Sequence, residues 1–178
     1  MTEDLQPVFE HEVLLGSVVC ADAGASEALR SRVIDGLVRF VKNPEMHAEG
    51  LQMNALTQDS SEPEKMVFHR SLQAGKVSFE DRVTVTQDAV IFDVSRQQEE
   101  IWEICSEASK YDSRGYYSES RQILEEGMIE REGVFLLRFS YEGEPGQKYP
   151  EYVEVLRQKA WVAKDQALAS AVAHDAGF

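Results

Sequence analysis

The stretch that decides the fold runs from Lys65 to Tyr111 and reads KMVFHRSLQAGKVSFEDRVTVTQDAVIFDVSRQQEEIWEICSEASKY. Apolar residues recur at every second position over three parts of it, 65–72, 77–86 and 89–94. This is the spacing of antiparallel strands that each bury one face. Short polar segments with turn residues separate the three parts. We therefore predict a three-stranded meander.

The same stretch is predicted to end in a helix. Ser95 and Gln98 have the spacing of a capping box, in which the side chains satisfy backbone N–H groups at the start of a helix. Apolar residues then follow at helical spacing, at Ile101, Ile104, Cys105, Ala108 and Tyr111. We expect this stripe to pack on the sheet.

The rest of the chain shows the same two periods. We predict, in order, a strand at 8–20, a helix that stops before Pro44, a short helix from about 118 to 131, a strand at 134–141, and a long helix from Pro150 to about 173. For residues 45–58 the pattern fits either a short helix or a loop. These elements predict an α+β fold, with a mixed or antiparallel sheet of about five strands, helices packed on one face and a long C-terminal helix.

Length and composition predict one globular domain over residues 1–178, with flexible segments at 1–6 and about 57–64. The acidic start lacks the features of a signal peptide, and no apolar run reaches the roughly 18 residues of a membrane span, so a cytoplasmic location is expected. The formal net charge of −14 would repel a phosphate backbone, which makes a nucleic-acid partner unfavourable. The same charge would suit a basic protein partner.

No residue pattern points to a metal, a cofactor or a catalytic group. Cys20 and Cys105 lie far apart in the chain, so we expect two reduced, buried thiols and no redox pair or zinc site. His11 is flanked by two glutamates, but on a strand it would point to the opposite face from both. Adjacent acidic residues such as Glu125 and Glu126 do not indicate a catalytic pair of carboxylates unless their positions in space are known. The missing motifs favour a protein that is not an enzyme, although a cofactor-free site of scattered residues stays open.

A segment rich in tyrosine is the first candidate site. Tyrosine and arginine are common at recognition surfaces, because a large amphipathic ring loses little entropy when it is ordered. We predict a partner-binding site made of Tyr111, Arg114, Tyr116 and Tyr117. The alternative is that these rings form the rim of the core.

The long C-terminal helix is the second candidate site, because it has two apolar stripes. One is a seam of mostly small residues that would let another helix approach closely. The seam consists of Val153, Leu156, Ala160, Ala163 and Ala167. The other stripe contains Trp161, Leu168 and Val172. A helix with two apolar faces either buries both within one domain or uses one in a homodimer.

In size, acidity and order of elements the chain resembles the small acidic chaperones that escort secreted effectors. The missing catalytic motifs, the negative charge, the tyrosine-rich segment and the two apolar stripes of the last helix lead to the first hypothesis. It is a non-catalytic cytoplasmic interaction protein, a chaperone, adaptor or inhibitor, that binds another protein through its acidic surface as a homodimer. The first alternative is a cofactor-free enzyme or small-molecule binder. Its pocket would lie between sheet and helices and be lined by Trp102, Tyr116, Phe135 and Phe139. The second alternative is an acidic mimic of nucleic acid.

Overall fold

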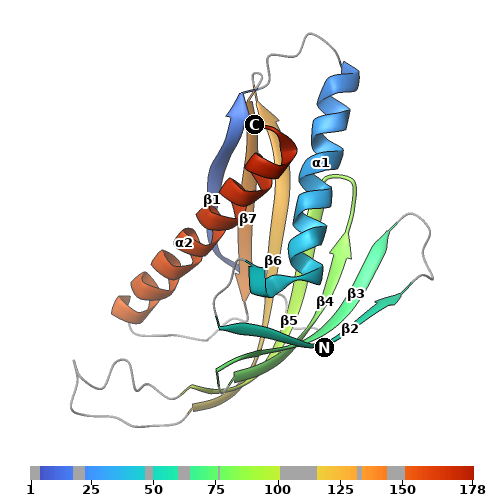
Figure 1. The fold of residues 1–178 in the computed structure, drawn as a ribbon. Coiled ribbons are helices and arrows are strands. Elements are labelled where there is room, and N and C mark those ends of the chain that lie inside the picture. Colours follow the sequence, from blue (N-terminus) through green and yellow to red (C-terminus); the bar gives the residue numbers. More distant parts are fainter. Residues whose placement is uncertain are drawn as a thin grey trace.

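A computed structural model describes residues 5–17, 23–46, 50–59, 65–75, 77–100, 116–131, 134–143 and 151–178. The elements are β1 (Gln6–Ser17), α1 (Ala23–Lys42), η1 (Pro44–Met46), β2 (Leu51–Asp59), β3 (Met66–Ala74), β4 (Val77–Val85), β5 (Ala89–Glu100), β6 (Tyr116–Arg131), β7 (Val134–Gly143) and α2 (Glu151–Ala176). The strands form one antiparallel sheet in the order β1-β7-β6-β5-β4-β3-β2, and both long helices lie on the same face of it (Figure 1). The predicted α+β class and long C-terminal helix are confirmed, but the sheet has seven strands, more than the about five predicted from layer packing.

The predicted meander is formed by β3, β4 and β5, which pair as consecutive antiparallel neighbours. Gly75 adopts a positive φ of 60° in the first connection, which favours glycine because it has no Cβ. In the second connection, the Thr86 hydroxyl oxygen accepts hydrogen bonds from the backbone N–H groups of Asp88 and Ala89. Alternating apolar residues and local turns thus define this part of the fold.

Two predicted helices are wrong where the structure describes them. β5 continues through the supposed capping box, and Ser95 pairs with Arg121 across the sheet. The short helix predicted at about 118–131 is strand β6, which is paired with both β5 and β7. Neighbouring strands provide the backbone partners here, so tertiary pairing overrides the local signal. The rest of the first predicted helix, 101–115, lies outside the described residues.

β2 explains the ambiguity of residues 45–58. It is an edge strand on which only Leu51 and Met53 are half-buried, so its sequence has almost no apolar period. Residues 57–59, expected to be flexible, belong to this strand and pair with β3. Of the other segments expected to be flexible, residues 1–4 and 60–64 lie outside the described residues, and β1 begins at Gln6.

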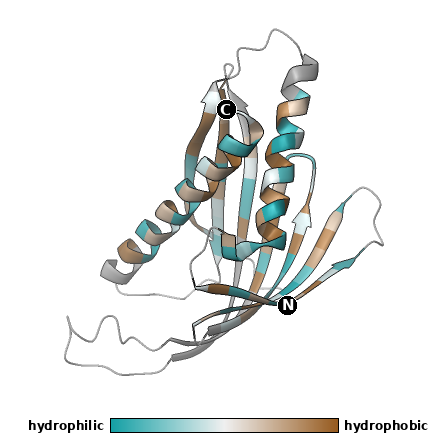
Figure 2. Ribbon diagram, viewed as in Figure 1, coloured by the Kyte–Doolittle hydropathy of each residue, from teal (hydrophilic) through white to brown (hydrophobic). Residues whose placement is uncertain are grey.

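The core lies between the sheet and the two helices. Both helices have hydrophobic and hydrophilic residues interleaved along their length, as expected where one face is buried (Figure 2). α1 buries Val33, Leu37 and Val41 among other residues, and α2 buries Leu168 and Val172. No helix in the described part of the chain is long and apolar enough to cross a membrane.

Candidate functional site

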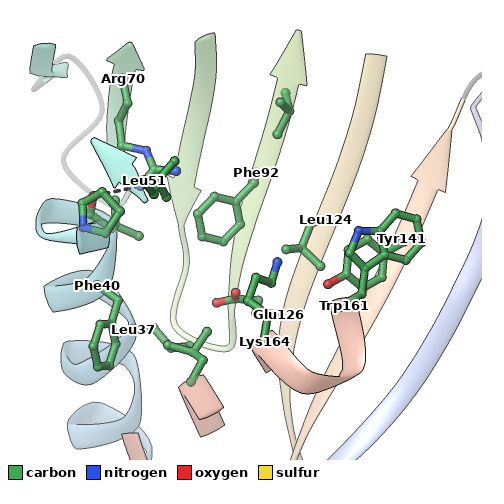
Figure 3. A pocket seen from close by; sticks show the side chains of 14 residues that line it. Leu37, Phe40, Leu51, Arg70, Phe92, Leu124, Glu126, Tyr141, Trp161 and Lys164 are labelled. Atoms are coloured by element: carbon green, nitrogen blue, oxygen red, sulfur yellow. Dashed lines mark hydrogen bonds between the residues drawn. The ribbon is translucent and has the colours of Figure 1, made fainter. Parts of the chain in front are cut away.

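A cavity of about 140 Å³ lies between the sheet, α1, η1 and α2 (Figure 3). Most of its wall is apolar or aromatic, including Leu37, Phe40, Phe92, Leu124, Trp161 and Leu168. An engineered cavity of roughly 150 Å³ in another protein is dry and binds benzene. The space therefore suits a ligand part the size of a single ring.

Glu126 is an acidic residue in this mostly apolar wall. It lies on β6 between the buried residues Leu124 and Met128, at a position that faces the helices, and it is only 3% exposed. Burial raises the pKa of its carboxyl group from 4.5 to about 8. The charges of Lys164 and Arg70 act in the opposite direction, and the charge of Asp165 raises the pKa further. Near neutral pH the group is therefore mostly protonated and can donate a hydrogen bond.

α2 places a cation at the same cavity. Lys164 lines the cavity with a side chain that is 39% exposed, whereas the side chain of Asp165 is fully buried. The Lys164 Nζ atom lies 3.5 Å from Asp165 Oδ1 and 5.7 Å from the centroid of the Tyr141 ring. Since Oδ1 accepts no hydrogen bond within the described part of the chain, this contact is a charge pairing. Figure 3 shows Lys164 entering the cavity from α2 and Glu126 from β6.

The other oxygen of Asp165 connects α2 to two strands. Asp165 Oδ2 accepts a hydrogen bond of 2.6 Å from the Tyr141 hydroxyl group on β7 and lies 2.7 Å from His11 Nε2 on β1. His11 thus faces the helix, while Glu12 lies on the other face and pairs with Arg138, as strand alternation predicts. The described residues contain no cluster of His, Cys, Asp or Glu that could hold a metal ion.

Arg70 lines the cavity, but its charge is already balanced. Its Nε atom donates a hydrogen bond of 2.8 Å to Asp81 Oδ1, and Nη2 donates to Asp81 Oδ2. Its Nη1 atom donates a bond of 2.9 Å to the carbonyl oxygen of Val41 near the end of α1. Both side chains of the ion pair are buried. Arg70 therefore fixes α1 to the sheet beside the cavity.

Stacked aromatic rings form another part of the wall. The rings of Trp161 and Tyr141 are nearly parallel, with centroids 4.4 Å apart and planes 6° apart. The Arg157 guanidinium carbon lies 5.1 Å from the centroid of the Trp161 ring. These contacts restrict the wall on the α2 side, so the cavity has a preformed boundary there.

The residues predicted as binding sites are either not described or absent from the cavity lining. Tyr116 and Tyr117 begin β6, but their side chains are not described, and Tyr111 and Arg114 lie outside the described residues. On the predicted seam, Leu156, Ala160, Ala163 and Ala167 are exposed, and the Val153 side chain is not described. The stripe with Trp161, Leu168 and Val172 is the one that packs toward the sheet. The partner site and the homodimer stay predictions.

The alternative of an enzyme or small-molecule binder expects a pocket between sheet and helices, and the cavity lies there, but its described lining differs from the expected one. Phe135 and Phe139 are fully buried in the core, and neither lines the cavity. Trp102, like Cys20 and Cys105, lies outside the described residues. The sequence reasoning missed Glu126, although a charged residue at an inward position of a strand is a recognisable signal once the strand is known.

No protein-family model and no curated protein matches the chain. Its structure is similar to the di-domain ARO/CYC protein StfQ from the steffimycin biosynthetic pathway, with a TM-score of 0.54 and 11% identity over 94% of this chain and 50% of that one. It is also similar to the di-domain ARO/CYC protein BexL from the BE-7585A pathway, with a TM-score of 0.54 and 9% identity over 96% of this chain and 50% of that one. For Ara h 8.0201 the TM-score is 0.53, with 11% identity over 95% and 98% of the two chains.

These likenesses show a shared fold, an antiparallel sheet with a long C-terminal helix packed on one face. The chain spans half the length of the two di-domain proteins. The prediction of a non-catalytic chaperone, adaptor or inhibitor is contradicted by these findings, because two of the structures that share the fold are described as ARO/CYC proteins of biosynthetic pathways. That prediction interpreted missing motifs and negative charge as signs of an interaction surface. The polar groups of the cavity wall lie far apart in the sequence, with Glu126 on β6, Tyr141 on β7 and Lys164 on α2, so no local motif contains them.

Proposed function

We propose that the chain binds a small organic molecule, with an apolar part the size of one ring, in the cavity between the sheet and the helices. The observation that supports this most is the buried carboxyl group of Glu126 in an otherwise mostly apolar wall. Burying a carboxyl group costs stability, and an apolar residue between Leu124 and Met128 would serve the core better. Ligand sites commonly combine an apolar lining with a few polar groups in this way.

The structural neighbours support the same proposal. StfQ and BexL are described as di-domain ARO/CYC proteins of the steffimycin and BE-7585A biosynthetic pathways. Ara h 8.0201 covers nearly the same length as this chain, so the fold also occurs without a second domain. These likenesses favour small-molecule chemistry, while the ligand itself has to be deduced from the cavity.

Binding can be tested with acetophenone as a single-ring probe in isothermal titration calorimetry. Leu124→Phe adds a ring next to the cavity and is expected to abolish binding, because the added volume occupies the ligand space. Leu14→Phe is the matched control, since Leu14 is 60% exposed on β1. Equal acetophenone affinity in wild type and Leu124→Phe would contradict binding in this cavity.

A second candidate function is cofactor-free acid–base catalysis on the bound molecule. It is favoured by the pKa of about 8 for Glu126, which lets the group give or take a proton near neutral pH. Lys164 could stabilise negative charge that develops on a carbonyl oxygen. Exchange of the acetophenone methyl hydrogens in D₂O, followed by NMR, tests this function. Exchange above background in wild type that is lost in Glu126→Gln would support catalysis.

A further inference from the structure

The protonation state of one carboxyl group determines the net charge of the cavity wall. Lys164 is balanced by Asp165, whose Oδ1 lies 3.5 Å from the ammonium group. Arg70 is balanced by Asp81 through two hydrogen bonds. These charged groups face Glu126 from α2 and from the β3–β4 pair. With Glu126 neutral, the charges of Lys164 and Arg70 are therefore offset by those of Asp165 and Asp81, which contact them without lining the cavity.

The position of Glu126 limits which ligand atoms it can meet. Its side chain lines the cavity among apolar residues, where the wall offers few other polar groups. A neutral carboxyl group there donates one hydrogen bond, and an ionised carboxylate only accepts. A ligand atom next to it must therefore match its protonation state.

We propose that Glu126 sets the selectivity of the cavity by donating a hydrogen bond to a neutral carbonyl group of the ligand, so that neutral carbonyl compounds bind and carboxylates of the same shape are rejected. The inference rests on the proposed binding function and adds the chemical class of the ligand. A bound carboxylate would add a full negative charge beside cations that Asp165 and Asp81 already pair, in a mostly apolar wall, which is unfavourable. A neutral carbonyl oxygen meets the donor without adding charge.

Proton-linked binding follows from this assignment. Because burial raises the pKa of Glu126 to about 8, the donor is present at pH 6 and mostly lost at pH 9.5. A group with this pKa is about 3% protonated at pH 9.5, so the affinity for a carbonyl compound should fall by about 30-fold. The ligand itself need not titrate.

Three probes of similar shape test the proposal by calorimetry at pH 6 and pH 9.5: acetophenone, cumene and benzoate. At pH 6, wild type is expected to bind acetophenone roughly tenfold more tightly than cumene, which lacks the acceptor, and benzoate roughly tenfold more weakly than cumene. At pH 9.5, acetophenone should lose about 30-fold in affinity. Acetophenone affinity that is equal at both pH values, or benzoate bound as tightly as acetophenone at pH 6, would overturn the proposal.

Two variants separate hydrogen bonding from charge. Glu126→Gln keeps a donor that never ionises, so its affinity for acetophenone should match wild type at pH 6 within a few fold and stay constant to pH 9.5. Glu126→Leu removes the donor and should bind cumene more tightly than acetophenone. Unchanged preference for acetophenone in Glu126→Leu would overturn the role of Glu126 while binding in the cavity stands. If no probe binds wild type at either pH, the proposed function itself fails.

Discussion

Replacing Glu126 by glutamine should make the protein more stable, by an amount that grows with pH. In the unfolded chain the carboxyl group has a pKa near 4.5, and burial raises it to about 8 in the folded protein. Between these values the folded state holds a proton that the unfolded state has released. The wild-type contribution is therefore most favourable below pH 4.5 and is lost as the pH rises through 8. Glutamine has no such dependence.

The magnitude follows from the size of the shift. One pKa unit corresponds to about 1.4 kcal/mol, so a shift from 4.5 to about 8 corresponds to about 5 kcal/mol in the free energy of unfolding. The stability gained by Glu126→Gln should grow by about 1.4 kcal/mol for each pH unit within this range and level off above it. The value of about 5 kcal/mol is an upper limit, because the surroundings of a buried carboxyl group can rearrange or admit water when it ionises.

Urea unfolding of both proteins from pH 5 to pH 9, followed by tryptophan fluorescence, measures this difference. Glu125→Gln is the matched control, because Glu125 is the adjacent glutamate and its side chain is exposed. We expect the control to follow the wild-type curve. If the difference between wild type and Glu126→Gln stays constant across the range, the assignment of a buried, mostly neutral Glu126 is refuted.

Two further predictions concern the ion pairs beside the cavity. Asp165→Ala should lower the free energy of unfolding by about 2–3 kcal/mol, because the buried Tyr141 and the half-buried His11 lose a common partner; thermal unfolding with a far-ultraviolet signal measures this, and an unchanged midpoint would contradict it. Arg70→Ala should cost about 3–5 kcal/mol by leaving the buried Asp81 unpaired. The double variant Arg70→Met with Asp81→Leu should recover much of that loss in the same assay, and a double variant no more stable than Arg70→Ala would argue against the pairing.

The sequence predicts those parts of the fold in which the polarity of each residue follows its burial. β7 alternates between buried and half-buried residues, β3 and β4 alternate between more and less buried residues over most of their length, and the buried face of α1 repeats at helical spacing. The ends of β5 and β6 have no such alternation, because residues 95–100 and 116–122 are mostly polar. They are strands because they pair with each other, and a pairing partner distant in the chain leaves no local period.

The candidate site was harder to predict for a related reason. Glu125 and Glu126 are equivalent by sequence, and only a strand places one in solvent and the other in the cavity. Lys164 approaches Glu126 from a helix nearly forty residues further along the chain, so no motif spacing connects the two. The cavity lies between sheet and helices, as the small-molecule alternative expects.

The contacts of Asp165 have a consequence for the order in which the molecule is completed. His11 lies in the first strand and Tyr141 in the last, yet both reach the same oxygen atom on the final helix. A nascent chain that has emerged only as far as β7 holds the whole sheet and α1 but lacks Trp161, Lys164 and the acceptor that joins the two strands to α2. The α2 side of the cavity is therefore completed only after synthesis has passed that helix, and β1 and β7 are then held to α2 through a single carboxylate oxygen.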